Sequence, residues 1–358
     1  MLVGGGLEHG GGIGRLVGYV ADAWNQETLP RLVVIDTRGP DLIVYWPFFF
    51  VRSIFQIIWY SWRRPLVHIH LAANFSTVRK LILANLVRLL RLGYVIHQHD
   101  PRYGDYYQSL PRWAQSLVRA MFIEARRVIV LGTPAAATTE TLIRVPHDRI
   151  EIFPNAVPGP ATPRPATAIA GQEEVHIVFL GRLIRRKGVH DLIEALARDE
   201  LRALSWRATL AGGGPDQRGF EEQAARAGID KRVGFPGWLD QGAIKALLET
   251  ADVLVLPSYA EEMAMSVLEG MAYGLCVVCT PVGALAEVVE HGVSAIVVEP
   301  GEAQGLATAL ANCVADSALR HRLGVGARQA FLQRYNIADY PQRLMAVYER
   351  AEERPDKE

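Results

Sequence analysis

Short apolar runs alternate with segments of helical periodicity along most of the chain. In the last third, apolar runs at 253–256 and 275–279 flank a segment in which Met265, Leu268 and Met271 recur at helical spacing. Brief runs rich in β-branched residues and bounded by Pro or Gly are typical of buried strands, and apolar residues three or four apart are typical of a helix with one buried face. The pattern therefore predicts a strand–loop–helix–strand unit.

The same alternation recurs on either side of this unit. Further strands are predicted at 32–36, 66–71, 94–100, 127–133, 150–155, 175–180, 208–211, 233–238 and 295–298. Further helices are predicted at 16–21, 78–92, 117–122, 189–197, 220–227, 241–250, 305–313, 317–333 and 340–349. Strands that alternate with helices indicate an α/β protein with doubly wound parallel sheets.

The domain organisation follows from an aperiodic stretch in the middle of the chain. Residues 156–172 contain four prolines, two glycines and five alanines, which indicates a linker. We expect two Rossmann-like domains at 1–156 and 173–335, a linker at 157–172, and a C-terminal helix within 336–358 that crosses back to the first domain. Only Leu2 and Val3 lie between Met1 and the first glycines, so we expect a truncated first strand.

Composition narrows the class of protein. The 358 residues carry equal numbers of basic and acidic side chains, so a nucleic-acid-binding protein is not indicated. Cys276 and Cys279 form a C-x-x-C inside an apolar run and Cys313 lies far along the chain, so we expect structural cysteines in a reducing cytoplasm. No secretory signal is visible at the N-terminus.

One segment has the composition of a membrane helix. It begins at Leu42, ends at Trp62 and contains a single charge, Arg52, over about the length of a bilayer span. Pro47 and the central arginine favour a buried or partly exposed connecting helix instead. Its aromatic first half, which includes Phe49 and Phe50, and the arginines that follow also suit a helix in a membrane interface. Peripheral contact with the inner membrane surface is therefore a second hypothesis.

Two glutamates mark a candidate ligand site around the helix predicted after 253–256. Glu261 lies in the loop and Glu269 about two turns into the helix, whose first N–H groups favour anions and polar oxygens. Such a site suits a hydroxylated, phosphorylated ligand. Glutamate is also common near helix starts, so a purely structural role stays open.

Two glycine-flanked loops are candidate phosphate sites. The strand at 175–180 leads into Gly181 and a turn with four cations, which has the charge and geometry of a phosphate cradle or of a solvated basic turn. Residues 10–14, four of them glycine, open a helix and would let the backbone approach a phosphate. They equally allow a dinucleotide site, with Asp36 as the ribose-binding acid of a nicotinamide enzyme.

Four histidines lie on two neighbouring predicted strands. His68, His70, His97 and His99 could be imagined as a metal cluster, because residues two apart on a strand share a face. Core residues separate them and no acidic or thiol ligand lies beside them, so we expect no metal. His99, at the strand exit, is expected to touch ligand. The aromatic segment 103–107 is expected to form a polar loop, which would either contact an acceptor or be a surface turn.

In combination, these motifs resemble those of the family-4 retaining glycosyltransferases. These enzymes have the GT-B architecture of two Rossmann-like domains that face one another across a cleft, and the chain is most similar to the branch that builds extracellular polysaccharides and lipid-linked oligosaccharides. The resemblance covers nearly the whole chain and rests on the segments GGGIGR, HQHD, PNAV, GRLIRRKG, AGGGP, VGFPGW, EEMAMSVLEGMAYGLCVV and TPVGALAEVVEHG, which occur in the family's order.

The resemblance implies a catalytic role for four residues. Arg182 and Lys187 would hold the diphosphate of a nucleotide-sugar and stabilise the leaving nucleotide in place of a metal. Glu261 would meet the transferred sugar, and His99 would contact its ring. No cofactor and no metal are expected, which agrees with the lack of a D-x-D sequence. Retention would follow from front-face attack, with the departing phosphate accepting the acceptor's proton.

The resemblance also implies a set of donor-binding residues. Glu269 would bind the ribose hydroxyls, and the backbone near Trp238 would read the base. The remaining contacts would come from the backbone at Gly11, Gly12, Gly181, Met263, Ala264 and Met265. Glu262 replaces the glycine usual in this loop, so strain is expected if the position needs a positive φ.

The leading hypothesis is therefore a cytoplasmic hexosyltransferase for surface polysaccharides. It would move a hexose from GDP-mannose or a UDP-hexose to a glycan or lipid-linked acceptor. Two alternatives stay open: a non-catalytic nucleotide- or glycan-binding homologue, and an NAD-dependent Rossmann oxidoreductase.

Overall fold

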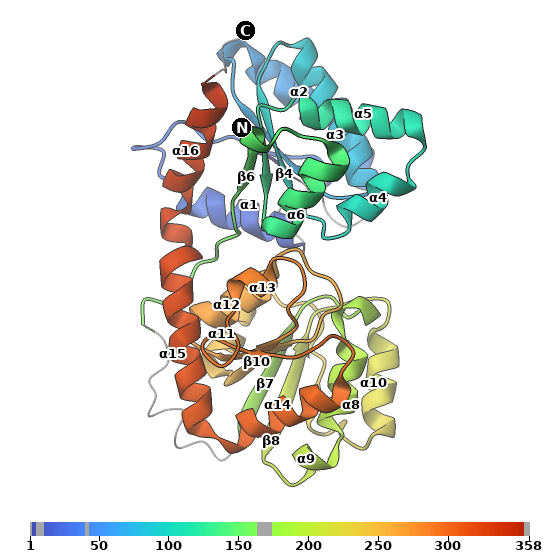
Figure 1. Ribbon diagram of the computed structural model, residues 1–358, viewed down its shortest axis with the longest axis vertical. Helices are drawn as coiled ribbons and strands as arrows, with labels where there is room; N and C mark the ends of the chain where they lie inside the picture. Colours follow the sequence, from blue (N-terminus) through green and yellow to red (C-terminus); the bar gives the residue numbers. More distant parts are fainter. Residues whose placement is uncertain (1, 5–10, 40–42, 163–173, 354–358) are drawn as a thin grey trace. The chain divides into compact units, whose positions relative to one another are not determined.

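The chain folds into two compact units, which are shown in Figure 1. The computed structural model describes residues 2–4, 11–39, 43–162 and 174–353. Unit 1 comprises Met1–Ala156 with Ile337–Glu358, and unit 2 comprises Val157–Asn336. The last helix of the chain thus belongs to the same unit as the N-terminal half.

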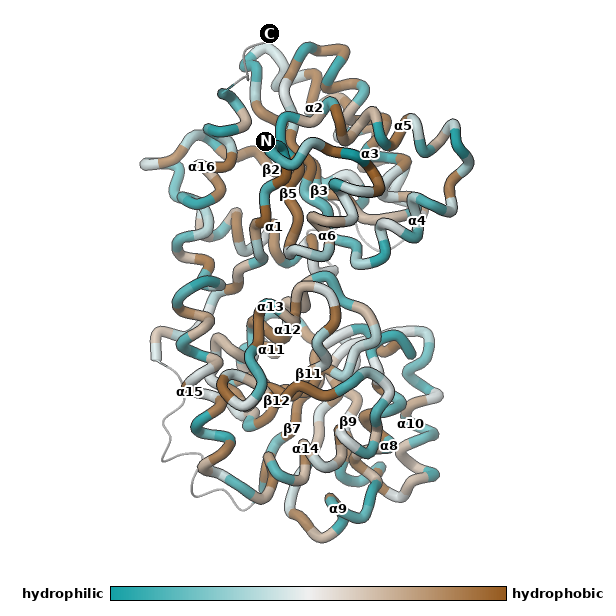
Figure 2. The backbone as a smooth tube through the Cα atoms, in the orientation of Figure 1, coloured by the Kyte–Doolittle hydropathy of each residue, from teal (hydrophilic) through white to brown (hydrophobic). Residues whose placement is uncertain are grey.

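Unit 1 contains a six-stranded sheet in the order β2-β1-β3-β4-β5-β6. Its strands are all parallel, and in chain order they are β1 (Leu2–Gly4), β2 (Val34–Asp36), β3 (Val67–Leu71), β4 (Tyr94–Gln98), β5 (Arg127–Val130) and β6 (Ile150–Ile152). Parallel sheets of this kind are covered by helices on both faces, so their central strands are buried and largely apolar. Figure 2 shows this as brown along β5.

The helices of unit 1 connect these strands and cover the sheet. They are α1 (Gly12–Ala23), α2 (Trp46–Tyr60), α3 (Phe75–Leu89), α4 (Tyr103–Ser109), α5 (Arg112–Ile123), α6 (Thr133–Thr138) and α16 (Tyr340–Glu352). Short helical turns occupy η1 (Ile43–Tyr45), η2 (Ser61–Arg63), η3 (Thr139–Ile143), η4 (His147–Arg149) and η6 (Ile337–Asp339). Val67, Ile69 and Leu71 of β3 share one hydrophobic core with residues of α2, α3 and α5.

The prediction of a polar loop at 103–107 was wrong. This segment lies in α4, with Tyr103 and Tyr107 buried. The Tyr103 ring packs against Phe122, with 5.5 Å between ring centroids, and its hydroxyl accepts a hydrogen bond from Thr77. Aromatic packing decided the structure here, where the polar residues had suggested a surface turn.

Unit 2 contains a second parallel sheet, in the order β9-β8-β7-β10-β11-β12. Its strands are β7 (Val175–Leu180), β8 (Trp206–Ala211), β9 (Val233–Gly234), β10 (Val253–Leu256), β11 (Cys276–Cys279) and β12 (Ile296–Val297). This is the Rossmann order, in which the chain's direction of travel across the sheet reverses between the first and fourth strands. Here the reversal lies between β7 and β10.

The helices of unit 2 are α8 (Val189–Leu196), α9 (Asp199–Arg202), α10 (Gln217–Arg226), α11 (Gln241–Thr250), α12 (Met265–Ala272), α13 (Leu285–Val288), α14 (Ala303–Ala315) and α15 (Ser317–Arg334), with the turn η5 (Arg185–Lys187). The cysteines are buried, and Cys276 Sγ lies 3.4 Å from Cys313 Sγ. The hydrogen bond to Cys313 and burial raise the pKa of the Cys276 thiol, as expected for a structural cysteine. The predicted α/β fold with two parallel sheets is confirmed.

Candidate nucleotide-sugar site in unit 2

Two loops of unit 2 meet at the point where the sheet order reverses. Lys187 ends the turn η5, which follows β7, and Glu261 lies in the loop that follows β10. Lys187 Nζ is 2.5 Å from Glu261 Oε1, and these side chains are only 15% and 10% exposed. The Ser258 hydroxyl donates a second hydrogen bond, of 2.7 Å, to the same oxygen. Ligands of open α/β sheets bind at this position, beyond the carboxyl ends of the strands.

Backbone contacts hold the two loops against each other. Gly188 has φ +69°, and a Cβ there would lie 1.9 Å from the carbonyl oxygen of Pro257. The Arg186 carbonyl accepts the N–H of Tyr259, and its guanidinium donates to the Ala260 carbonyl at 3.1 Å. Position 188 therefore requires glycine for two reasons: its positive φ, and the short distance between its backbone and the Pro257 carbonyl.

The loop that carries Glu261 is fixed by the segment after β11. The Ala284 N–H donates to the Glu262 carbonyl at 2.8 Å, and a Cβ at Gly283 would lie 1.8 Å from the Glu261 carbonyl oxygen. Glu262 is not among the described non-glycine residues with positive φ. The strain expected at Glu262 is therefore absent, because the left-handed conformation in this corner is at Gly283.

Glu269 and the predicted backbone donors lie around the start of α12. Ala264 is the N-cap residue and contributes no capping side chain, and the buried Glu269 lies in the second half of the helix. Met263, Ala264 and Met265 are also buried. These residues therefore belong to the same βαβ unit as the Glu261 loop. Their role as donor ligands stays a prediction.

The other predicted residues of unit 2 lie on a neighbouring pair of loops. Arg182 is exposed after β7. The loop that carries Gly181 contacts the one after β8, because a Cβ at Gly212 would lie 1.8 Å from the Gly181 carbonyl oxygen. The Trp238 indole lies against Gly213, where a Cβ would meet its Nε1 at 2.5 Å. Sequence reasoning assigned no role to Gly212 or Gly213, although the run of three glycines after a strand was a signal for such close approaches.

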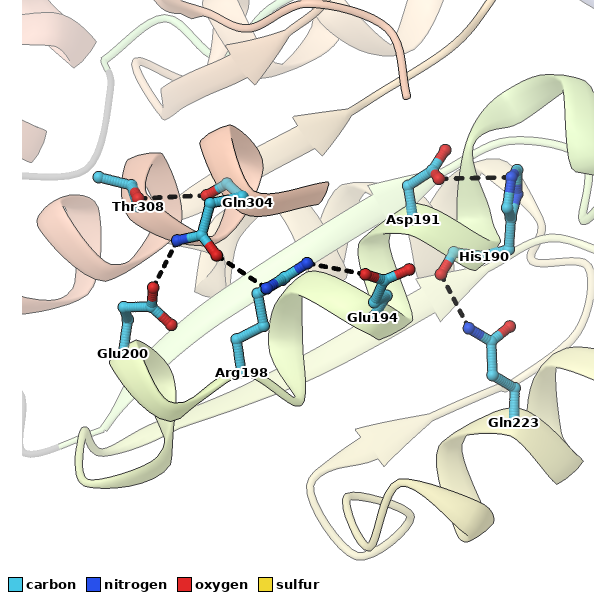
Figure 3. Close-up of polar contacts among 8 residues, drawn as sticks. All are labelled: His190, Asp191, Glu194, Arg198, Glu200, Gln223, Gln304 and Thr308. Atoms are coloured by element: carbon cyan, nitrogen blue, oxygen red, sulfur yellow. Dashed lines mark hydrogen bonds and ion pairs between the residues drawn. The ribbon is translucent and has the colours of Figure 1, made fainter. Parts of the chain in front are cut away.

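A polar network holds α8, the helix that follows Lys187 (Figure 3). The Arg198 guanidinium donates to Glu194 of α8 and to Gln304 of α14, at 2.8 and 2.7 Å. Gln304 donates in turn to Glu200, and Gln223 of α10 donates to the His190 carbonyl at 2.9 Å. Exposed pairs of this kind contribute little energy individually. Together they connect α8 to α9, α10 and α14, and so fix the direction in which the Lys187 turn enters the helix.

Unit 1 contains the remaining predicted residues. Gly11 is the N-cap residue of α1 and Gly12 its first residue, and Gly11 has φ −116° with no atom within 4 Å of a Cβ built there. Gly10, also part of the glycine cluster, lies outside the described residues. Asp36 Oδ1 accepts the backbone N–H groups of Arg38 and Gly39, at 2.8 and 3.0 Å. That oxygen closes the turn after β2.

His99, which directly follows β4, belongs to a stack of four buried or half-buried histidines with His68 and His70 of β3 and His97 of β4. His70 and His97 are paired across the strands, and His70 Nδ1 is 2.9 Å from His99 Nε2. His68 Nδ1 is 2.7 Å from the Tyr348 hydroxyl of α16. Burial holds the pKa of His68, His70 and His97 well below the ordinary value, and lowers that of His99 to about 3, so the imidazoles are neutral at pH 7.

The geometry of this stack bears on metal binding. One ring nitrogen each from His68, His70 and His97 lies within 4.8 Å of the others. However, the His68 and His70 rings are parallel to within 12°, and His97 is tilted from them by only 30° and 31°. The nitrogen lone pairs of stacked rings lie in nearly parallel planes, whereas the ligands of a tetrahedral ion point towards a common site. This arrangement suits a neutral imidazole stack, and the expectation of no metal stays a prediction.

Comparison with known proteins finds similar glycosyltransferases. The "Glycosyl transferases group 1" family matches residues 165–330. The 2-deoxystreptamine N-acetyl-D-glucosaminyltransferase of Streptomyces fradiae is 29% identical over 308 residues, which is 80% of this chain and 71% of the relative.

Two solved structures are similar over nearly the whole chain. Anabaena HepE in complex with UDP and glucose has a TM-score of 0.75 at 19% identity, with 97% of this chain and 98% of that chain covered. WaaG, a glycosyltransferase involved in lipopolysaccharide biosynthesis, has a TM-score of 0.71 at 17% identity, with 97% and 98% covered. These likenesses establish the fold. Residues 165–330 thus match the glycosyl transferases group 1 family, and the two parallel-sheet units have a fold similar to that of the GT-B glycosyltransferases.

Proposed function

We propose that the protein is a retaining hexosyltransferase of family 4 that uses a nucleotide-sugar and needs no metal. The donor would be GDP-mannose or a UDP-hexose, and the acceptor a glycan or a lipid-linked glycan in surface polysaccharide synthesis. The observation that carries this proposal is the Lys187–Glu261 pair at the point where the order of the unit 2 sheet reverses. It combines a cation for a diphosphate with a carboxylate for sugar hydroxyls at the position where Rossmann sheets bind nucleotides.

The proposed chemistry requires charge stabilisation and positioning. The bond between the sugar's anomeric carbon and the diphosphate oxygen breaks, and the acceptor oxygen forms a bond to the same carbon on the same face. The acceptor's proton passes to the departing phosphate oxygen. Lys187 and the exposed Arg182 stabilise the negative charge that develops on that phosphate, as oxyanion-stabilising groups do in other enzymes.

The remaining residues would orient the donor. Glu261 holds Lys187 in place and accepts hydrogen bonds from sugar hydroxyls, while Glu269 accepts them from the ribose. His99, neutral at pH 7, would contact the sugar ring. The UDP and glucose bound by HepE, and the N-acetylglucosaminyl transfer named for the Streptomyces fradiae relative, support a nucleotide-sugar donor for this chain.

Two alternatives make different predictions. An NAD-dependent oxidoreductase would need Asp36 for the adenosine ribose, but one oxygen of that carboxylate already binds two backbone N–H groups. It would also leave the Lys187–Glu261 pair without a function. The non-catalytic homologue was considered because of Glu262 and the short first strand. Glu262 is not among the described non-glycine residues with positive φ, so the first of these two reasons no longer applies.

Ligand binding and turnover separate the three functions. Isothermal titration with UDP, GDP and NAD should give binding of one nucleoside diphosphate, and binding of NAD alone would refute the proposal. Transfer from labelled GDP-mannose, UDP-glucose, UDP-galactose and UDP-GlcNAc should then identify the donor. Turnover should persist in EDTA, so a strict requirement for added Mg²⁺ or Mn²⁺ would contradict the metal-free mechanism. Binding without turnover of any donor would favour the non-catalytic homologue.

A further inference from the structure

We propose that unit 1 docks on a bilayer surface of anionic lipid through the outer face of α2. This inference is independent of the chemistry proposed for unit 2, because it concerns other residues and a different ligand.

The outer face of α2 is apolar although it is exposed. Exposed apolar residues recur at intervals of three or four from α2 into η2: Phe48, Val51, Phe55, Ile58 and Trp62. Trp59, next to Ile58, is also exposed. Phe55, Trp59 and Trp62 are 67%, 74% and 71% exposed. The opposite face contains the buried Ser53 and Ile57, with Phe50 and Ile54 packed against the core. The helix thus has two apolar faces, and the core of unit 1 covers only one of them.

The neighbouring helix α3 extends the apolar surface of unit 1. α3 packs against α2, as Figure 1 shows, and exposes Phe75, Val78, Ile82 and Leu89 along one side. Twenty large hydrophobic side chains are exposed among the described residues, and twelve of them lie between Val44 and Leu89. Single exposed hydrophobic residues are ordinary, whereas such a concentration marks an interaction surface.

Charge identifies the partner as an anionic surface. Residues 42–99 contain seven Lys and Arg and no Asp or Glu, while the chain as a whole is neutral. Lys80 is buried, and five of the arginines are exposed: Arg52, Arg63, Arg64, Arg88 and Arg91. Arg52, Arg63 and Arg64 on and beside α2 are exposed, and the Arg63 guanidinium lies 4.6 Å from the centroid of the Trp62 ring. Each cation near an anionic membrane contributes about 1 kcal/mol of attraction.

The residue types on this face favour lipid over a second protein. Trp and Phe beside Arg are typical of helices that lie in the membrane interface with their apolar side in the acyl chains. Among the described residues, no helix is long and apolar enough to cross a membrane. The structure also corrects the positions expected to touch lipid: Phe50 packs on the core, and the Phe49 ring lies against Gly39.

The test is binding to vesicles of phosphatidylcholine with 30% phosphatidylglycerol, compared with phosphatidylcholine alone. The full chain should sediment with the anionic vesicles, and high salt should weaken the binding. The variant Phe55→Ser/Trp59→Ser/Trp62→Ser should reduce the partition at least tenfold, and Arg63→Gln/Arg64→Gln should reduce it on anionic vesicles only. The matched control is Val325→Ser/Leu332→Ser, which removes two exposed apolar side chains of α15 in unit 2 and should bind like the wild type.

Hydrogen exchange of the wild-type chain keeps the proposal testable if the serine variant misfolds. Peptides from α2 should gain protection when anionic vesicles are added. A wild-type chain that binds neither vesicle, or a folded serine variant that binds as well as wild type, would overturn the proposal. It would equally be overturned if this face formed a dimer that Trp59→Ser dissociates while vesicles bind nothing, because a second copy would then be the occupant.

Discussion

Lys187 Nζ lies 2.5 Å from Glu261 Oε1, although 74 residues separate them in the chain. The pair joins the turn after β7 to the loop after β10. Both side chains are largely buried, so neither charge can be removed without leaving the other in a poorly solvated position. The same contact that would place a cation for the donor's phosphates therefore also contributes to the stability of unit 2.

This coupling is measurable by a double-mutant cycle. Lys187→Met and Glu261→Gln should each lower the free energy of unfolding by about 1–3 kcal/mol, because each leaves one buried partner unpaired. The double variant should lose clearly less than the sum of the two, since no unpaired charge is left. Urea unfolding measures the three values. Strict additivity would show that the two side chains do not interact in solution.

Gly188 should tolerate no side chain. Gly188→Ala forces a Cβ towards the Pro257 carbonyl and a left-handed conformation on alanine, so it should cost about 2–4 kcal/mol of unfolding free energy. The matched control is Gly219→Ala in α10, where no atom lies within 4 Å of the added Cβ. That change should stabilise by about 0.5–1 kcal/mol, because alanine is the better helix former. Equal melting temperatures for the two variants would refute the close approach of the loops.

The histidine stack should make unit 1 sensitive to acid. The pKa values of His68, His70 and His97 are held well below the ordinary value by burial, and that of His99 falls to about 3. Below about pH 6.5 the unfolded chain therefore binds more protons than the folded one. The contribution of these histidines to the free energy of unfolding is fully present above that pH. It is lost as the pH falls towards 3, by up to about 1.4 kcal/mol per pH unit for each histidine.

The variant His97→Leu tests this dependence. Neither ring nitrogen of His97 has a hydrogen-bond partner among the described residues, so leucine should raise stability at pH 7 by about 1 kcal/mol and make the pH dependence shallower. Hydrogen exchange of peptides from β3 and β4 between pH 4 and 8 reports both effects, with the exposed His147→Leu as the control. A steeper pH dependence in His97→Leu than in wild type would rule out a neutral stack.

Periodicity was sufficient to predict most of the fold, because strands buried on both faces leave long apolar runs. β7 and α11 were predicted with their observed bounds. The α4 helix was missed because its buried tyrosines carry polar groups, and the burial of Tyr103 depends on Phe122, which is distant in the chain. Sequence motifs could select Lys187 and Glu261 but not their direct contact, which depends on strand order. The exposed side of α2 could not be assigned either, because apolar residues occur on both of its faces.

Transfer of labelled sugar by the Lys187→Ala variant tests the central claim most directly. Removal of a group that stabilises the leaving phosphate should lower kcat/KM by about 10²–10³-fold with the donor identified in the screen. The matched control is Lys245→Ala, at an exposed lysine of α11 that also pairs with a glutamate, and its kcat/KM should equal that of the wild type. A folded Lys187→Ala variant, verified by its melting curve, that transfers sugar at the wild-type rate would contradict the account.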